Sequence, residues 1–487
     1  MKHFPALVLL IFCIFGAAAA RADTQVSMTG DARIYANFWS KYQYTGWNYN
    51  GTQTADTATI WERFRLQTDF VANDNLKFRL AIRVDDSAGK SAWGSGTFTV
   101  DNPAVCLEVY NAYLDFKWPN TELHFTVGYQ NFDLPFSADW MGANPVMGGT
   151  TVAGAVVEIP VADAFKIVTG AMRLLDSDKS GFAPKTTQVV PDLDGYFLSL
   201  PITLDGFKAT PWGMVAVAGR NADYAGTGVG DSPNSNESLA TNLFSAAGTT
   251  ATSTFRNSQN VYWWVGTTVA VTALDPFKFY GDIMYGAGNE GDHGYDKRSG
   301  MFFDVAAEYA GFDIVNIQTT FWYSPGEDSS MSNGSERMPS VVDYWGPTNS
   351  FLFNSGQELN FGFMGVNPVG SWGLVAGLDK ISFIKDLTNR LVFSFAQGTN
   401  SPTALRNANL LAGTGNYVQI GRDLTTKEHV LAVNLDTHYD LNEHLAVIVE
   451  TGWSHGDFQT SVWGHRFTNQ TRDGDAWKVG FGLAYKF

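Results

Sequence analysis

The sequence predicts an all-β fold: a closed antiparallel transmembrane β-barrel of about 18 strands. Three observations support this prediction. Apolar and polar residues alternate in one segment after another, the connections between these segments are alternately short and long, and the last segment ends on an aromatic residue. Alternation with period two places successive side chains on opposite faces of a strand. A sheet with one continuous apolar face needs a cover, and lipid provides it when the sheet closes on itself.

The chain begins with a segment that has the features of a secretory signal. A short basic start precedes the apolar run Leu7–Phe15, and Ala20 and Ala22 form an A-x-A cleavage pattern. The run is short for a spanning helix, which would be the alternative interpretation. We therefore expect a signal peptide at 1–22 and one barrel domain at 23–487.

The composition fits an exported protein with many strands and tight turns. Hydrophobic residues make up 45% of the chain, aromatic residues 14%, and there are 49 glycines. Removal of the signal takes away Lys2 and Arg21 and changes the formal charge from −16 to −18. A chain this acidic is an improbable nucleic-acid partner. Cys13 leaves with the signal, so Cys106 remains alone, and we expect it to be a small buried residue.

The first three predicted strands show the alternation most clearly. The first carries Val26, Met28, Ala32, Ile34, Ala36 and Phe38 on one face and Asp31 and Arg33 on the other. In WERFRLQTDF, the residues Phe64, Leu66 and Phe70 alternate with Arg63, Arg65, Gln67 and Asp69. The turn NDN follows at 73–75, and then Leu76, Phe78, Leu80, Ile82 and Val84 alternate with Lys77, Arg79, Arg83 and Asp85. The second and third strands are thus predicted to form a hairpin.

The same pattern predicts fifteen further strands. They are expected at about 105–117, 122–132, 150–160, 165–175, 194–204, 207–220, 258–273, 276–287, 300–310, 312–323, 370–384, 388–397, 427–440, 443–455 and 474–487. In the last of these, Trp477, Val479, Phe481, Leu483, Tyr485 and Phe487 share one face. Because an open edge would leave unpaired backbone groups in hydrocarbon, we expect this strand to pair with the first.

The connections between the predicted strands fall into two sets. Short ones lie at 73–75, 119–120, 162–163, 205–206, 275–276, 310–311 and 440–442, whereas 221–257, 324–355 and 398–426 are long and polar. Short turns at one end and long loops at the other are typical of a bacterial outer-membrane barrel, with periplasmic turns and extracellular loops. The alternative is a large soluble array of β-sandwiches, which lacks this strict alternation.

Several stretches resemble the trimeric outer-membrane porins, and most of all the major homotrimeric porins of sulfate-reducing bacteria. They are VSMTGDARIYANFWS, WERFRLQTDF with NDN and LKFRLAIRV, NAYLDFKW with LHFTVGYQNF, and the final LAYKF. The resemblance covers nearly the whole mature chain, more weakly in the long loops. It implies a homotrimer in the outer membrane, in contact with lipid and lipopolysaccharide, that takes up small hydrophilic solutes passively. General porins usually have 16 strands, so 16 is the alternative to 18.

The candidate pore residues form two oppositely charged sets. The basic set shares the inward parity of the first three strands: Arg33, Arg63, Arg65, Lys77, Arg79 and Arg83. The resemblance implies that an acidic loop folds into the pore after the fifth strand, and the corresponding segment, 133–149, contains Asp133 and Asp139. Opposed charges would create a field across the pore that favours polar solutes. The alternative is that the arginines only pair with Asp31, Asp69 and Asp85 to fill the lumen.

Other residue patterns allow a second reading of the transport function. Trp39, Trp61, Tyr262, Trp264 and Trp322 fall on the inward parity. A row of aromatics could guide sugars, although such residues also occur in the girdles at the two membrane interfaces. The function expected first is a porin for passive diffusion of small hydrophilic solutes and ions. The alternative is a substrate-selective, sugar-type channel with 18 strands.

Catalytic and metal-binding motifs are weak in this sequence. Asp176, Asp178 and Ser180 resemble the start of a calcium loop, but its twelfth position is Thr187 instead of Glu. No H-E-x-x-H or G-x-S-x-G motif occurs. We therefore expect no enzyme activity, no cofactor and no specific metal site. A barrel enzyme or a structural outer-membrane protein remains the rival class, because a fold alone does not fix function.

Overall fold

The structure is a computed structural model, and it describes residues 24–41, 44, 57–87, 107–175, 192–219, 242–243, 259–289, 297–330, 332–341, 346, 353, 358–359, 366–411, 418–468 and 475–487. Some sequence-based expectations lie outside these ranges. They are the signal peptide at 1–22, the lone Cys106 and the weak calcium candidate Asp176, Asp178 and Ser180.

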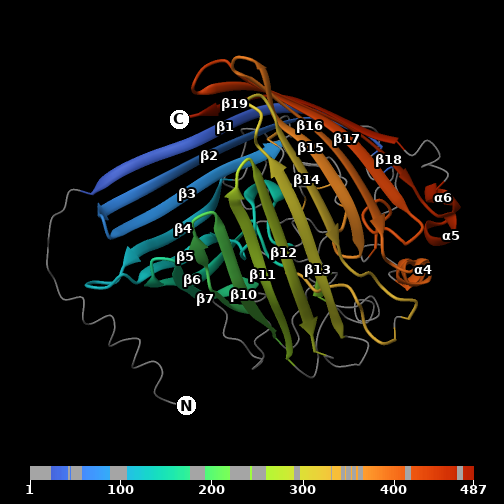
Figure 1. Cartoon of the computed structure of the whole chain (residues 1–487), viewed down its shortest axis with the longest axis horizontal. Coiled ribbons are helices and arrows are strands. Elements are labelled where there is room, and N and C mark those ends of the chain that lie inside the picture. The colour runs from blue at the N-terminus through green and yellow to red at the C-terminus, as the bar shows by residue number, and fades with distance from the viewer. Residues whose placement is uncertain are drawn as a thin grey trace.

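The described chain folds into one antiparallel sheet of long strands (Figure 1). Its first half consists of β1 (Gln25–Ser40), β2 (Thr57–Asn73), β3 (Leu76–Ser87), β4 (Glu108–Lys117), β5 (His124–Phe132), β6 (Thr150–Ala162), β7 (Phe165–Leu175), β8 (Leu193–Ser199), β9 (Ile202–Leu204) and β10 (Phe207–Ala218). The second half consists of β11 (Asn260–Leu274), β12 (Phe277–Gly288), β13 (Arg298–Tyr309), β14 (Asn316–Tyr323), β15 (Ser371–Ile384), β16 (Leu387–Gly398), β17 (His429–Asp440), β18 (Leu445–Asp457) and β19 (Asp475–Lys486).

The sheet closes into a barrel because β1 pairs with both β2 and β19. Figure 1 shows these three strands side by side. The closure extends to the last residue, since the backbone N–H of Phe487 donates to the Gly30 carbonyl and the Gly30 N–H donates back, each at 3.1 Å. The prediction that the last strand pairs with the first is confirmed, and no backbone edge is left open between these two strands.

Two of the labelled segments, β8 and β9, together form one strand of the barrel. Both pair with β7 on one side and β10 on the other. Pro201 lies in the gap between them and has no N–H to donate to a ladder, so the strand is interrupted there. The 19 segments therefore make 18 strands around the barrel. The prediction of 18 strands is confirmed, and the alternative of 16 is wrong.

The two faces of the barrel wall differ as the alternation predicts. On β19, Phe481 and Leu483 are 52% and 42% exposed and point outward, whereas Lys478 and Ala484 point inward and are 2% and 4% exposed. Large apolar side chains are exposed in the same way on most other strands. The outer face is thus suited to lipid. Burying polar residues on the inner face requires something inside the barrel.

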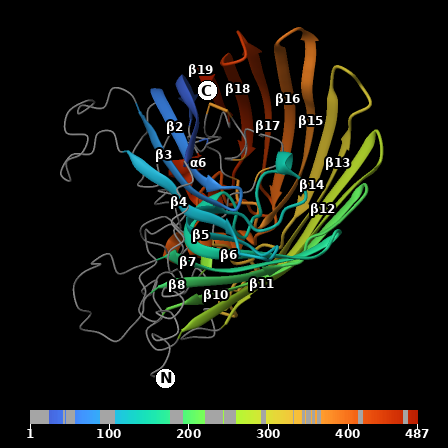
Figure 2. The ribbon, with the colours of Figure 1, turned by 90° about the vertical axis from the view of Figure 1, so that its left-hand side faces the viewer.

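Connecting segments fill part of the interior. Buried side chains of the wall, such as Trp264, Phe302 and Trp322, pack in one cluster with loop residues Met338 and Phe353. Figure 2 shows segments running within the curve of the sheet instead of staying outside it. Part of the barrel core is therefore made by chain that returns inward between strands.

Short helices occur in these connections. They are η2 (Asp139–Met141), α4 (Pro402–Leu411), α5 (Thr460–Trp463) and α6 (His465–Thr468). No helix in the described ranges is both long enough and apolar enough to span a membrane.

Candidate pore lumen and binding pocket

Asp31 of β1 is the common partner of three predicted basic residues. Its carboxylate lies 2.7 Å from Nε of Arg65, 3.2 Å from Nη2 of Arg63 and 3.8 Å from Nε of Arg33. The strand register explains the cluster, because Asp31 lies opposite Arg65 and Arg33 lies opposite Arg63. One carboxylate therefore offsets part of three positive charges that adjacent strands bring together.

The other predicted basic residues also have acidic partners. Arg79 makes two parallel bonds of 2.7 Å to Asp69, the strong bidentate geometry of arginine and carboxylate. Arg83 lies 2.8 Å from Glu108, and Lys77 lies 3.0 Å from Asp115. The side chain of Asp85, a third predicted partner, lies outside the described part of the structure. A guanidinium has five N–H donors, more than one carboxylate accepts, so pairing is compatible with a role in the pore.

The segment 133–149 leaves β5 and reaches the wall at β12. The hydroxyl of Ser137 donates to the carboxylate of Asp282. The ring of Trp140 lies edge-on to Tyr280, with 5.6 Å between the ring centroids and 85° between the ring planes. Because β5 and β12 are well separated around the barrel, these contacts carry the segment through the lumen.

The two acidic residues proposed for this segment occupy different positions. Asp133 lies at its base, where its carboxylate accepts bonds from the Gly149 N–H and, at 3.0 Å, from the side-chain amide of Asn131. Asp139 begins η2 and is exposed. Its carboxylate makes no hydrogen bond within the described ranges. Asp133 thus fixes the base of the segment, whereas the charge of Asp139 is available to solvent and solute.

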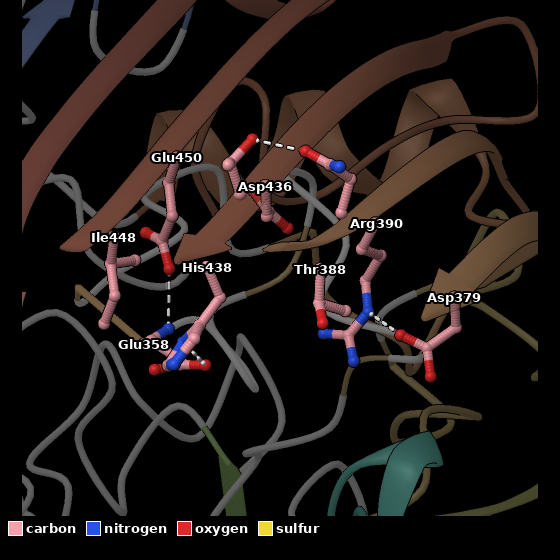
Figure 3. Close-up of a pocket in the computed structure, with 10 residues that line it drawn as sticks. Glu358, Asp379, Thr388, Arg390, Asp436, His438, Ile448 and Glu450 are labelled. Atoms are coloured by element: carbon pink, nitrogen blue, oxygen red, sulfur yellow. Dashed lines mark hydrogen bonds and ion pairs between the residues drawn. The ribbon is translucent and has the colours of Figure 1, made fainter. Parts of the chain in front are cut away.

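A cavity of about 80 Å³ opens in the inner wall of β15 to β18 (Figure 3). Its lining combines four acids, two nitrogen bases, three uncharged polar residues and one aliphatic residue: Glu358, Asp379, Asp436 and Glu450; Arg390 and His438; Thr388, Asn389 and Thr437; and Ile448. Arg390, Asp436 and Glu450 lie in register across β16, β17 and β18. Regular alternation on three neighbouring strands thus produces one continuous polar patch.

Most charged groups of this pocket are paired. Arg390 lies 2.7 Å from Asp379, and Lys478 of β19 lies 3.3 Å from Glu450. His438 contacts Glu358 through Nδ1 at 3.1 Å. Asp436 accepts a 3.0 Å bond from the amide of Asn434. The pocket therefore presents carboxyl, hydroxyl and amide groups side by side, with Arg390 and His438 among them.

One side of the pocket is a piece of inserted loop. The carboxylate of Glu450 accepts the backbone N–H groups of Glu358 and Leu359 at 2.6 and 3.0 Å. From the basic wall, Arg33 donates to the Glu358 carbonyl. Gly482 of β19 leaves room for the loop, because a Cβ there would lie 2.5 Å from Cβ of Tyr35 and 2.8 Å from Cδ2 of Leu359. The loop therefore joins the basic wall to the acidic pocket.

A buried ion pair holds two other loops together. Arg337 and Asp423 are 2% and 1% exposed and lie 2.7 Å apart, and Arg422 lies 2.8 Å from the same carboxylate. Burial would raise the pKa of Asp423, but the guanidinium groups of Arg422 and Arg337 outweigh it and hold that pKa below its usual range. Asp423 is therefore ionised in its buried position.

Two glutamates in the same loops behave in the opposite way. Burial raises the pKa of Glu327, against the nearby Arg337 and the hydroxyl of Ser335, which lies 2.5 Å away. Burial also raises the pKa of Glu428, although its carboxylate accepts bonds from the Gln459 N–H at 2.7 Å and the Trp463 indole at 2.9 Å. These loops thus combine a carboxylate stabilised as an anion with two whose charged form is disfavoured.

Three of the five predicted inward aromatics are buried, and they form no open row along the lumen. Tyr262, Trp264 and Trp322 are each 0% exposed. The Trp264 indole donates to the Pro339 carbonyl at 2.7 Å, and the Trp322 indole donates to the Ser371 hydroxyl at 3.1 Å. Ser371 begins β15, and the loop contact of Trp322 is with the ring of Phe353. Trp264 and Trp322 thus contact inserted loops, which differs both from a sugar-guiding row and from an interface girdle.

The fold is shared with solved barrels from Pseudomonas aeruginosa. OccK2 (OpdF) in complex with glucuronate aligns with a TM-score of 0.53 and 9% identity over 95% of this chain and 98% of that one. OpdL aligns at 0.52 with 10% identity over 95% and 99%. The outer membrane protein OprD aligns at 0.51 with 11% identity over 96% and 95%. The chain has the OprD and Occ barrel fold. No protein-family model matches the chain, and no curated protein matches it either.

This OprD-like barrel contains site residues that the sequence patterns did not identify. Glu450 and Lys478 lie on the inward parity, but the two residues are nearly thirty positions apart and meet only through the pairing of β18 with β19. Glu358, Arg337 and Asp423 belong to loops that carry no periodic pattern. The available signal was the presence of charged residues of both signs within the long loops. Such charges can form buried pairs when the loops fold inward, whereas charges that serve only solubility need no buried partner.

Proposed function

We propose that the protein forms a water-filled channel in the bacterial outer membrane for passive diffusion of small hydrophilic solutes and ions. The observation that carries this proposal is the closed 18-stranded barrel with an apolar outer face and a charged inner face. Lipid contacts the outer face, and water or polar solutes contact the inner face. The fold shared with the outer membrane protein OprD supports the same location.

The charges of the lumen support a transverse field in this channel. The basic wall of β1 to β3 and the exposed Asp139 of segment 133–149 supply opposite signs. We propose that the basic wall and this segment face each other across the constriction and favour polar over apolar solutes. Segment 133–149 would then set the width of the pore.

A substrate-selective channel is the second candidate, and the pocket in the inner wall of β15 to β18 favours it. A cavity lined by carboxylates, hydroxyls, an amide and a guanidinium is suited to binding a hydroxyl-bearing solute instead of only passing it. OccK2, a solved barrel of the same fold, is in complex with glucuronate. Selective binding would slow the passage of the preferred solute through the lumen.

Bilayer recordings distinguish these functions. A general pore is expected to give stepwise conductance that sugars at millimolar concentration do not change. A selective channel is expected to show current block by its sugar at micromolar to millimolar concentration. Complete absence of conductance, with the barrel verified as folded by its heat-dependent gel mobility, would exclude both and favour an enzyme or a structural protein.

We also propose that residues 1–22 are cleaved as a signal peptide and that the mature chain forms homotrimers surrounded by lipid and lipopolysaccharide. Ala32 and Ala36 share the outward parity of β1 with Ile34 and Phe38, and small residues there let two barrel walls approach closely. One repeated interface closes naturally into a cyclic trimer. Three conductance sublevels are expected in planar bilayers, and a three-step cross-linking ladder is expected in mild detergent. A monomer without a ladder would contradict this assembly.

A further inference from the structure

Asp282 of β12 and Asp304 of β13 form an unusual acidic pair on the inner wall. The two residues lie directly opposite each other in the strand register. They are 3% and 1% exposed. Both oxygens of Asp304 and one oxygen of Asp282 have no hydrogen-bond partner within the described ranges. Three of the four carboxyl oxygens are therefore buried side by side without the donors that such groups normally require.

Hydroxyl-bearing residues lie on one side of this acidic pair. Ser137 of segment 133–149 donates to the remaining oxygen of Asp282. Thr268 of β11 lies opposite Asp282 in the register and is 5% exposed. On the other side, Asp304 lies opposite Trp322 of β14, and Thr320, two residues before Trp322 on the same inward face, is 0% exposed and has a hydroxyl oxygen without a partner in the described chain. The polar groups in contact or in register with Asp282, those of Ser137 and Thr268, are thus hydroxyls.

An all-oxygen set with two acids matches the chemistry of a hard divalent cation. Calcium and magnesium bind carboxylate, hydroxyl and water oxygens. The charge of one divalent ion equals that of two carboxylates, so a single ion would offset both. One proton shared between the carboxyls would join one oxygen of each and would leave the other oxygen of Asp304 without a partner.

We propose that Asp282, Asp304 and Ser137 bind a divalent cation, for which Ca²⁺ is the reference ion. Thr268, opposite Asp282 in the register, provides a neighbouring oxygen, and water completes the coordination. Since Ser137 belongs to segment 133–149, the ion fastens that segment to the wall of β12 and β13. With only two carboxylates in the set, the affinity is expected to be modest.

Calorimetric titration of the full-length barrel in detergent tests this site. After treatment with EGTA and its removal, the wild-type chain is titrated with CaCl₂, and one ion per chain is expected to bind. Asp304→Asn is expected to abolish binding. The matched control is Asp69→Asn, which removes an inner-wall carboxylate already paired with Arg79 and is expected to leave binding unchanged. Ser137→Ala is expected to weaken binding without abolishing it.

Folding of each variant is checked by heat-dependent gel mobility. A wild-type chain that binds no calcium would overturn the proposal, and so would an Asp304→Asn variant that binds as well as wild type. A wild-type melting temperature that responds to acid but not to calcium would identify a shared proton instead and would also overturn it. The titration requires no conductance, so its outcome is independent of whether the barrel is a channel.

Discussion

The basic wall of β1 to β3 and the loop-covered wall of β12 to β19 have the same alternation but different environments. On the basic wall, side chains such as Arg63 and Arg65 are 20% and 36% exposed, and their acidic partner comes from the neighbouring strand. On the loop-covered wall, Asp304 and Lys478 are 1% and 2% exposed. There the partner of Lys478, Glu450, also comes from the neighbouring strand, but loops distant in sequence cover the wall, as Leu359 does beside Glu450.

This difference shows that strand parity sets the direction of a side chain, whereas the returning loops set its burial. A charge pair in contact with water contributes about 0–1 kcal/mol, because water screens it and its geometry costs entropy. Removing one partner of a buried pair costs about 3–5 kcal/mol, because the other charge stays buried without compensation. Substitutions on the loop-covered side should therefore have larger effects on stability than those on the basic wall.

The largest effect is expected for Asp423→Asn in the buried loop clamp. The change leaves Arg337, which is 2% exposed, without its carboxylate. We expect the clamped loops to lose about 3–5 kcal/mol of local stability and the conductance of the channel to rise. Amide hydrogen exchange of residues 332–341 and single-channel recording measure the two effects.

The matched control for the clamp is Asp386→Asn. Lys385 and Asp386 lie 4.0 Å apart, and their side chains are 91% and 50% exposed. This Asp-to-Asn change is expected to alter neither hydrogen exchange nor conductance. Equal effects of the two variants would show that burial under the loops does not strengthen these pairs, and the contrast between the two walls would be lost.

The double variant Arg63→Gln, Arg79→Gln tests the basic wall. Both side chains point to the lumen and are about one-fifth to one-quarter exposed, at 20% and 24%. We expect reversal potentials in a salt gradient to shift towards cations and the conductance to change. The barrel should remain folded, since exposed pairs contribute about 1 kcal/mol or less.

Asp31→Asn provides the opposite change on the same wall. It leaves Arg33, Arg63 and Arg65 without their shared carboxylate, so the selectivity should move towards anions. If neither variant changed the reversal potential, the basic wall would only fill the lumen, as the alternative from sequence holds.

The sequence was sufficient to predict the barrel because each strand carries its own period-two signal. The apolar outer face of β19, from Trp477 to Phe487, is readable without any other part of the chain. The break at Pro201 was not predicted, since the flanking alternation continues through it. Likewise, β14 begins at Asn316, four residues later than the alternation suggested.

The site was less accessible to prediction for a physical reason. Parity placed Arg33 on the inner face, but it contains no information about which loop reaches that face. The contacts of Arg33 with Glu358 and of Asp282 with Ser137 join residues far apart in the chain. Such contacts depend on the volume left inside the closed barrel, which is fixed only when all 18 strands are in place.

The third prediction concerns the pH response of the loops through Glu327. Burial raises its pKa, so the protonated carboxyl is the form favoured in the closed loop. The contribution of Glu327 to the stability of the closed loops is therefore complete below its ordinary pKa of 4.5. It decreases as the pH rises from there to the raised pKa. Limited proteolysis of the loops should become faster across this interval in wild type and show no such increase in Glu327→Gln.

Asp423 sets the lower limit of that experiment. The pKa of Asp423 is lowered, so its contribution to the stability of the loops is present above its ordinary pKa of 3.8. That contribution is lost as the pH falls below this value. Measurements should therefore stay above this pH. If Glu327→Gln retained the wild-type pH dependence, another group would control the loops.

The smallest effect on stability, with a distinct effect on selectivity, is expected for Asp139→Asn. The carboxylate of Asp139 is exposed and makes no hydrogen bond within the described ranges, so its removal should change stability by no more than about 0.5 kcal/mol. Asp133→Asn is the comparison, because Asp133 accepts two bonds at the base of the same segment. The amide keeps one acceptor, so the segment should loosen and the noise of the channel current should increase.

If segment 133–149 narrows the pore opposite the basic wall, Asp139→Asn should move reversal potentials towards anions, opposite to Arg63→Gln, Arg79→Gln. An unchanged reversal potential in Asp139→Asn, with altered noise in Asp133→Asn, would assign the segment a structural role without a field across the pore.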